Sequence, residues 1–159
     1  MAALVDKIVV VDIEATCWEH DAPPGEKSDI IEIGVVLLDV RNLKLGTPMQ
    51  VIIKPTRSTV SAFCTRLTGI SQQEAANGID LSAACTTLRG EYESDKRLWA
   101  SYGDYDRRMF EMGCDDLRIQ YPFGHGHLNV KTLVAVTLGL PCEVSLNTAL
   151  NKLGLEFVG

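Results

Sequence analysis

Residues 7–14 read KIVVVDIE, a β-branched apolar run of strand length that ends in two carboxylates. The apolar part is too continuous for an exposed strand, which favours a central position in a sheet. Further apolar runs follow at 30–38 (IIEIGVVLL) and 49–53 (MQVII), and a tight connection at 42–46 lies between them. Because tight connections join antiparallel neighbours, these three segments predict an antiparallel meander.

Later segments alternate between helix and strand patterns. Helix-start signals occur at Ser71 (with Glu74 as a capping box), Asp80, Asp104 and Ser145. Residues 97–101 (RLWAS) are typical of a short buried strand, and the helix that follows them is expected to end at Gly113. The order of elements along the chain is strands first, then alternating helices and strands. This order predicts a single three-layer α/β domain with a mixed central sheet over residues 1–159.

Composition limits the class of protein. A chain of 159 residues, 46% of them hydrophobic and 23% charged, can close one sizeable core and has no room for a second domain. No stretch approaches the roughly 20 apolar residues that span a bilayer, and the start of the sequence does not match a secretory signal. The five cysteines are scattered and form no C-x-x-C pair, so we expect reduced thiols in a cytoplasmic protein without a membrane partner.

The net charge of −6 narrows the possible nucleic-acid partners. Proteins that grip long stretches of phosphate backbone do so through many Lys and Arg contacts, which this acidic chain does not favour. An enzyme that engages only a few terminal nucleotides, and takes its positive charge from bound metal ions, remains compatible with this composition.

The end of the first strand carries a pair of carboxylates, Asp12 and Glu14. Because side chains alternate along a strand, both carboxylates project from the same side of the sheet. Like charges this close repel unless a cation lies between them, and hard oxygen ligands suit Mg²⁺ or Mn²⁺. The alternative is an ordinary solvated strand end.

A second acidic segment, Gly103-Asp104-Tyr105-Asp106, follows the RLWAS strand, and α/β sheets bind ligands at strand ends. Asp104 is suited to cap the next helix, whereas Asp106 lies in the first turn, where the helix dipole stabilises a carboxylate. We therefore assign Asp106 as the ligand and Asp104 as the cap. Three carboxylates from distant segments are what a two-metal phosphodiester site requires.

Other residues have competing interpretations. Glu32 is either a fourth carboxylate near the metals or a strand residue held by hydrogen bonds near the sheet edge. His125 and His127 lie in a glycine-rich connection, where an ordinary loop role is favoured over that of a general base. Packing or solvation is likewise the favoured role of Trp18, Trp99, Arg107 and Arg108.

Four motifs together resemble a known family. They are DIEATC at 12–17, IIEIGVVLL at 30–38, FCTRLTGI at 63–70 and WASYGDYDRRMF at 99–110. In order and spacing they resemble the DEDD exonuclease superfamily of the DEDDh type, most closely its Eri-type branch of 3′ exoribonucleases. The resemblance extends over the chain from Lys7 onward. It implies a ribonuclease-H-like fold and 3′-to-5′ hydrolysis of terminal phosphodiester bonds in single-stranded nucleic acid, with RNA favoured over DNA, releasing nucleoside 5′-monophosphates.

The resemblance also implies roles for individual residues. The catalytic and metal-binding carboxylates would be Asp12, Glu14 and Asp106, with two Mg²⁺ or Mn²⁺ ions per site. Residues near the 3′-terminal nucleotide would be Ala15 and Thr16, with Leu67 and Thr68 in contact with its base. Apolar and backbone contacts to an unpaired base are typical of single-strand recognition.

One element of the family pattern is missing. In the family, a histidine followed five residues later by the fourth aspartate comes shortly after the helix that ends in L-G-L, and here LGLEFVG occupies residues 153–159. We therefore expect a form of the exonuclease domain that is shortened at its C-terminus and impaired in hydrolysis. The alternative is a catalytically inactive module that keeps the exonuclease fold and binds nucleic acid. The sequence does not indicate a protein partner.

Overall fold

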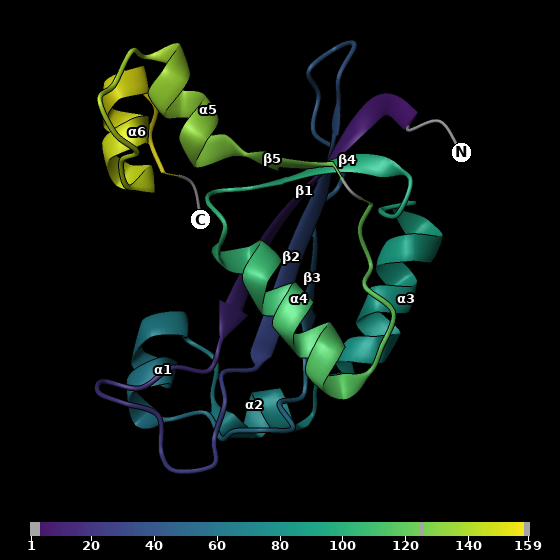
Figure 1. The fold of residues 1–159 in the computed structure, drawn as a ribbon, viewed down its shortest axis with the longest axis vertical. Coiled ribbons are helices and arrows are strands. Elements are labelled where there is room, and N and C mark those ends of the chain that lie inside the picture. Colours follow the sequence, from purple (N-terminus) through teal and green to yellow (C-terminus); the bar gives the residue numbers. More distant parts are fainter. Residues whose placement is uncertain (1–3, 125, 158–159) are drawn as a thin grey trace.

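A computed structural model describes residues 4–124 and 126–157 (Figure 1). The strands are β1 (Leu4–Ala15), β2 (Ile30–Asp39), β3 (Met49–Ile52), β4 (Arg97–Ser101) and β5 (His127–Asn129). The helices are α1 (Ala62–Thr68), α2 (Gln72–Ala76), α3 (Leu81–Glu91), α4 (Tyr105–Leu117), α5 (Val130–Thr137) and α6 (Leu146–Leu153). No described helix has the length and apolar character needed to cross a bilayer.

The strands form one mixed sheet in the order β3-β2-β1-β4-β5. The pairs β1–β2 and β2–β3 are antiparallel, which confirms the predicted meander. The pairs β1–β4 and β4–β5 are parallel, so β1 lies at the centre, where the antiparallel and parallel parts meet. The apolar run of residues 7–14 therefore takes the central position that its composition predicted.

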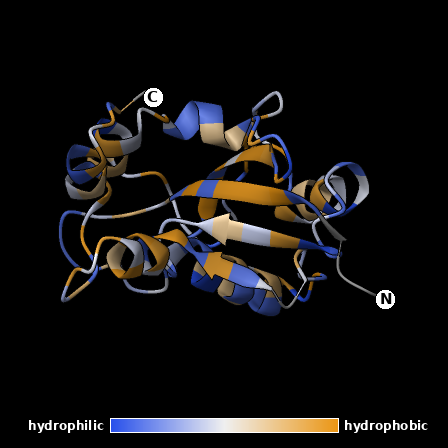
Figure 2. Ribbon diagram, turned by 90° about the horizontal axis from the view of Figure 1, so that it is seen from above, coloured by the Kyte–Doolittle hydropathy of each residue, from blue (hydrophilic) through white to orange (hydrophobic). Residues whose placement is uncertain are grey.

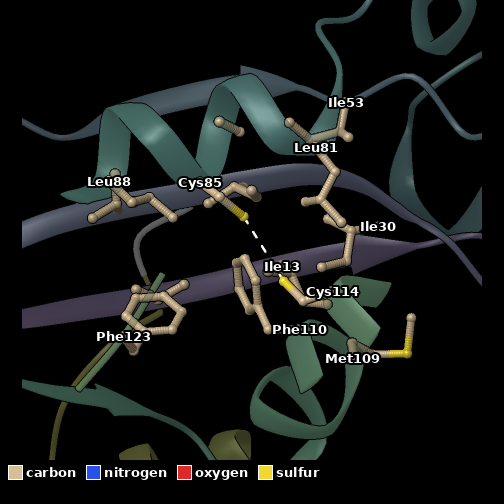
Figure 3. Packing of buried hydrophobic residues seen from close by; sticks show 14 of the residues in the cluster. Ile13, Ile30, Ile53, Leu81, Cys85, Leu88, Met109, Phe110, Cys114 and Phe123 are labelled. Carbon is tan, nitrogen blue, oxygen red and sulfur yellow. Dashed lines mark hydrogen bonds between the residues drawn. The ribbon is translucent and has the colours of Figure 1, made fainter. Parts of the chain in front are cut away.

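The main core lies between one face of the sheet and the helices α3 and α4. Alternate residues of β1, namely Val9, Val11 and Ile13, belong to this core together with apolar side chains of both helices. Figure 3 shows Ile13 near Phe110 and Cys114 of α4. Trp99 of β4 is only 1% exposed and stacks on Phe123 with ring centroids 4.1 Å apart, which confirms its packing role. Figure 2 shows the strands as largely hydrophobic, as burial in this core requires.

The opposite face of the sheet is covered unevenly. The short helices α1 and α2 lie at one end of the sheet (Figure 1), where they contribute to a smaller cluster that includes Ile31, Cys64 and Ala75. The helices α5 and α6 lie together beyond β5, far from α1 and α2 (Figure 1). Between them the face is open, with a hollow of about 530 Å³ over β1, β2 and β3 that Asp12 and Glu32 help to line. The predicted second helical layer is therefore partial.

Some element boundaries differ from the sequence prediction. The capping box of Ser71 and Glu74 begins α2, and Ser145 begins α6, as predicted. The prediction that α4 ends at Gly113 was wrong, because α4 continues to Leu117. Gly113 is buried, and a Cβ atom there would lie 3.2 Å from a methyl group of Leu81. This glycine therefore permits close packing of α4 against α3 and does not stop the helix.

Two glycine-to-alanine substitutions are expected to change stability in opposite directions. Gly69 caps α1 with a φ of +79°, so alanine there should destabilise the fold by about 1 kcal/mol. Gly90 lies inside α3 with open space around its Cα, so alanine should stabilise the fold by about 0.5 kcal/mol. Urea denaturation of both variants measures the difference. Equal effects of the two substitutions would contradict this assignment of α1 and its cap.

Candidate active site

Asp12 and Glu14 lie near the end of β1 and project from the open face of the sheet. Ile13 between them is 6% exposed and points into the main core on the other side. In the β1–β2 register Glu14 lies opposite Glu32, and Asp12 lies opposite Gly34. The alternation of side chains thus places both carboxylates on one side, as predicted, and brings Glu32 beside them.

Asp106 reaches the same region from a segment distant in sequence. Strand β4 runs parallel to β1, and the chain then turns at Gly103, whose φ is +108°, before α4 begins at Tyr105. This turn places Asp106 beside β1, where its Oδ1 accepts a hydrogen bond from the Ile13 amide at 3.1 Å. Only 5% of Asp106 is exposed, so its carboxyl group is fixed and buried.

The pKa values of these carboxyl groups show that they share one electrostatic field. Burial raises the pKa of Asp106 to about 6, and the charge of Asp12 adds to this shift, while the Ile13 amide and the Ser101 hydroxyl oppose it. The pKa of Glu14 is raised by burial and then by Asp12, Glu32 and Asp106. The pKa of Asp12 is raised by burial and by Glu32. Each carboxylate therefore disfavours ionisation of its neighbours.

Among the residues that the structure describes, this cluster has no ion pair with a protein cation. Within the described part of the chain, no Lys, Arg or His nitrogen lies within 4.0 Å of a carboxyl oxygen of Asp12, Glu14, Glu32 or Asp106. Several carboxylates without a counter-charge are the donor set that hard divalent cations take. The chemistry of these residues therefore fits Mg²⁺ or Mn²⁺.

The positions of these carboxylates fit a metal ion less well than their ligand type does. Among residues 4–124 and 126–157, no three His, Cys, Asp or Glu side chains converge closely enough to hold an ion. Asp106 uses one carboxyl oxygen for the Ile13 amide, which leaves the other available. A bound ion would therefore need a shift of the Asp12 or Glu14 side chain, or ligands beyond these carboxylates.

The prediction that Asp104 caps the next helix is confirmed for its position only. Asp104 is the N-cap residue of α4, but its side chain makes no capping hydrogen bond. Its Oδ1 instead lies 3.1 Å from Nη2 of Arg107 and 3.7 Å from Nδ1 of His127. These two nitrogens draw the carboxylate away from the amides at the start of the helix. Asp106 does lie in the first turn, as predicted.

The histidines and Glu32 can now be placed. His127 is in β5, and its Nε2 hydrogen-bonds with the Ser101 hydroxyl at 2.9 Å, so it does not contact the acidic cluster directly. His125 lies outside the described residues. Glu32 accepts a hydrogen bond from Gln50 at 2.6 Å, as the strand interpretation predicted, and its charge raises the pKa of Asp12. A role of Glu32 near metal ions stays a prediction.

The four predicted substrate residues have different surroundings. Ala15 and Thr16 are buried, and the Thr16 hydroxyl accepts from the Asp29 amide at 2.8 Å. Thr68 donates its hydroxyl to the Cys64 carbonyl within α1, whereas Leu67 is 68% exposed. Contacts of these residues with a nucleotide stay a prediction, and Leu67 has the most accessible side chain of the four.

Tyr105 was missed by the sequence reasoning. About half of its surface is exposed, and its pKa is raised chiefly by burial, with contributions from the charges of Asp106 and Glu14. The phenol therefore lies at the edge of the acidic cluster. The signal was an aromatic residue between two aspartates directly after a strand, although such a residue is more often a packing residue.

Comparison with known proteins identifies the family. Residues 9–159 match a family model described as an exonuclease. The chain belongs to this exonuclease family. The rat 3′-5′ exoribonuclease 1 is 30% identical over 165 residues, which cover 97% of the chain and 47% of that relative. The Drosophila 3′-5′ exonuclease Snipper is 40% identical over 79 residues, which cover 48% of the chain and 28% of that relative. The chain thus spans about half or less of the length of these relatives.

Solved exonuclease structures share the fold. The full-length 3′-exonuclease superimposes with a TM-score of 0.85 at 27% identity, covering 100% of this chain and 74% of that one. The nuclease domain of 3′hExo, a DEDDh family member bound to rAMP, gives a TM-score of 0.82 at 25% identity, with 100% and 84% coverage. The chain therefore belongs to the DEDDh-type, Eri-like exonuclease family and has the ribonuclease-H-like fold that its motifs implied.

The stability of this exonuclease domain without metal is expected to fall as pH rises through the acidic range. The Asp106 pKa rises from 3.8 to about 6 on folding, so between these pH values the folded protein keeps a proton that the unfolded chain has released. The contribution from Asp106 is roughly 3 kcal/mol, present below pH 4 and lost above pH 6. Thermal melts in EDTA from pH 4 to 7 measure this effect.

The matched control is Asp106→Asn, which keeps an oxygen acceptor for the Ile13 amide and removes the titration. Most of the decline between pH 4 and 6 should disappear in this variant, relative to the parent protein. Mn²⁺ should raise the melting temperature of the parent more at pH 7 than at pH 5, because the ion competes with protons for the carboxylates. A decline that persists in the variant would show that another group causes it.

Proposed function

We propose that this chain is the catalytic domain of a metal-dependent 3′-to-5′ exonuclease. Its reaction would be hydrolysis of the terminal phosphodiester bond of single-stranded nucleic acid, RNA in preference to DNA, with release of nucleoside 5′-monophosphates. The observation that carries the proposal is the group of uncompensated carboxylates, Asp12, Glu14 and Asp106, at adjacent ends of β1 and α4 in an exonuclease-family fold.

The carboxylates would hold the metal ions and orient the phosphodiester. Asp12 and Glu14 lie on the open face, where a phosphate can approach from solvent, and Asp106 is anchored beneath them by the Ile13 amide. Two divalent ions, when bound, would stabilise the negative charge that develops on the attacking and leaving oxygens. The raised pKa values favour this role, since carboxylates that repel one another gain most from a cation.

Exposed apolar side chains beside the cluster support recognition of an unpaired base. Leu67 projects from α1, and the Cys64 thiol of the same helix contacts the Ala15 carbonyl at the end of β1. Tyr105 offers a half-exposed aromatic ring at the edge of the acidic group. Stacking and apolar contact bind bases without reading their sequence. The acidic net charge is consistent with an enzyme that contacts only a few nucleotides.

The test is a degradation assay with the full-length protein that the gene encodes. Single-stranded RNA labelled at its 5′ end, and DNA of the same sequence, would each be incubated with Mn²⁺ or with EDTA. We expect stepwise shortening from the 3′ end, faster for RNA, only with metal, and nucleoside 5′-monophosphates as products. Internal cleavage, or shortening in EDTA, would contradict the proposal. Binding of RNA without shortening would instead identify the inactive binding module.

A further inference from the structure

The end of β1 departs from regular pairing directly after Glu14. From Lys7 to Glu14 each residue of β1 lies opposite the next residue of β2, and Glu14 lies opposite Glu32. Ala15 then lies opposite Ile30, so one residue of β2 is passed over between these two pairs. Irregularities of this kind change the direction of a strand and of the side chains beside it. The direction of the Glu14 side chain therefore depends on what fixes the backbone at this point.

Side chains from other segments hold the backbone after this irregularity. The three consecutive carbonyl groups of residues 15–17 each accept a hydrogen bond from a different side chain. The donors are the Cys64 thiol for Ala15 at 3.5 Å, the Ser28 hydroxyl for Thr16 at 2.6 Å and the Ser61 hydroxyl for Cys17 at 2.7 Å. Cys64 and Ser61 belong to α1 and its N-cap, whereas Ser28 precedes β2. Segments far apart in sequence therefore fix the backbone next to Glu14.

The polar groups of Thr16 are all used inside the protein. Thr16 is 1% exposed, and its hydroxyl accepts from the Asp29 amide at 2.8 Å and hydrogen-bonds with the Ser58 hydroxyl at 2.7 Å. Its own amide donates to the Asp29 carbonyl at 2.8 Å. Asp29 is itself fixed by the buried ion pair with Arg57. The Thr16 hydroxyl therefore joins the end of β1 to two other segments, and a nucleotide could reach it only by displacing one of these partners.

Glu14 depends on its backbone more than Asp106 or Glu32 does. Asp106 is anchored by the Ile13 amide, and Glu32 by the side chain of Gln50. The Glu14 carboxyl is subject to burial and to the repulsion of neighbouring carboxylates, and within the described part of the chain no hydrogen bond holds it. Repulsion alone would turn this side chain away from the cluster. A rigid backbone beside Glu14 is therefore needed to keep its carboxylate next to the others.

We propose that Thr16 is a positioning residue for Glu14. Its buried hydroxyl holds the irregular end of β1 against Asp29 and Ser58, which keeps the Glu14 carboxylate within the acidic cluster. The inference rests on the proposed function only for its effect on the reaction rate. Two other roles lead to different results. A hydroxyl that contacts the nucleotide would change KM, and one that only stabilises the fold would leave the activity of folded molecules unchanged.

The test compares Thr16→Val, which keeps the shape of the side chain and removes the hydroxyl, with Thr16→Ser, which keeps the hydroxyl. Residual dipolar couplings of the amide N–H bonds of residues 13–17, measured by NMR in EDTA, report the direction of the backbone without metal or substrate. We expect the couplings of Glu14 and Ala15 to change in Thr16→Val and to stay close to those of the parent in Thr16→Ser. Unchanged couplings in Thr16→Val, or equal changes in both variants, would overturn the proposal.

A kinetic measurement separates positioning from substrate contact. With the full-length protein, Mn²⁺ and labelled RNA, Thr16→Val should lower kcat per folded molecule at least about tenfold and leave KM within about twofold, because misplacement of a catalytic group costs rate. Thr16→Ser should restore kcat. The matched control is Thr86→Val, which removes an exposed hydroxyl bonded to the Ser82 carbonyl within α3 and should behave as the parent does. An unchanged kcat in Thr16→Val, with or without a rise in KM, would rule out positioning.

Ser58→Ala is a second variant that decides the matter if Thr16→Val does not fold. Ser58 is only half-buried, and its replacement removes one of the two partners of the Thr16 hydroxyl. We therefore expect the same changes in the couplings and in kcat, at smaller size, and their absence would count against the role of Thr16. A parent protein that does not trim RNA would contradict the proposed function, whereas the dipolar couplings would still decide whether Thr16 positions Glu14.

Discussion

Replacing Glu14 by Gln is expected to abolish RNA trimming while leaving the fold as stable as before, or more so. The glutamine keeps the size of the side chain and removes one of several mutually repelling charges, whose repulsion is seen in the raised pKa values of Glu14 and Asp12. A metal ligand that supplies several kcal/mol to the transition state is worth at least about a thousandfold in rate. The full-length protein would be assayed with Mn²⁺ and labelled RNA.

The control for this substitution is Asp21→Asn. Asp21 is an exposed carboxylate in the loop after β1, so its removal changes net charge equally without altering the cluster. Activity of the control should be close to that of the parent. Thermal melts of both variants show whether any loss comes from unfolding. A Glu14→Gln protein that trims RNA within tenfold of the parent rate would show that this carboxylate is not needed.

The largest expected loss of stability follows from replacing Arg57 by Ala. Arg57 donates through Nε to Asp29 at 2.6 Å and is also paired with Asp116, and the side chains of Arg57 and Asp29 are 15% and 6% exposed. Without the Arg57 side chain, the buried Asp29 carboxylate keeps the hydrogen bonds from the backbone amides of residues 56 and 57 but loses its counter-charge. Breaking a buried ion pair in this way costs about 3–5 kcal/mol. Urea denaturation at pH 7 measures the loss.

Lys27→Ala is the matched comparison, because Lys27 pairs with the same Asp116 from a position that is 58% exposed. Exposed pairs contribute roughly 0–1 kcal/mol, so this variant should be nearly as stable as the parent. Arg57→Lys should not restore stability, since lysine cannot supply the Nε and terminal donors together. If Arg57→Ala and Lys27→Ala lost the same amount, the buried pair would not hold the fold together.

The same ion pair also supports the candidate site. The Thr16 amide donates to the Asp29 carbonyl at 2.8 Å, and the Asp29 amide donates to the Thr16 hydroxyl at the same distance. Asp29 thus joins the residues directly after β1 to the segment that carries Arg57. Loss of Arg57 should therefore also lower activity modestly, by loosening the residues next to Glu14.

The meander, the buried strand β4 and the helices α2, α3 and α6 were predictable, because local signals specify each of them. Alternation and apolar runs mark the strands, and Ser71 and Ser145 mark helix starts. The strand β5 was not predicted, since its three residues pair only because β4 lies alongside, with Trp99 opposite His127. The role of Gly113 also depends on a contact with α3 that no local pattern reveals.

The sequence predicted which residues form the candidate site better than it predicted how their side chains are arranged. Strand periodicity placed Asp12 and Glu14 together, and the position of Asp106 followed from a strand end and a helix start. The hydrogen bond from Ile13 to Asp106 and the use of Asp104 by Arg107 and His127 were not predictable. Each depends on contacts between segments far apart in sequence, as does the proximity of Tyr105.

Calorimetric titration of the 159-residue chain with Mn²⁺ tests most directly whether the acidic cluster is a metal site. We expect saturable binding at pH 7 that weakens at least about tenfold in Glu14→Gln and remains unchanged in Asp21→Asn. No binding by the parent chain, or equal affinity in the parent and Glu14→Gln, would contradict the assignment of these carboxylates as metal ligands.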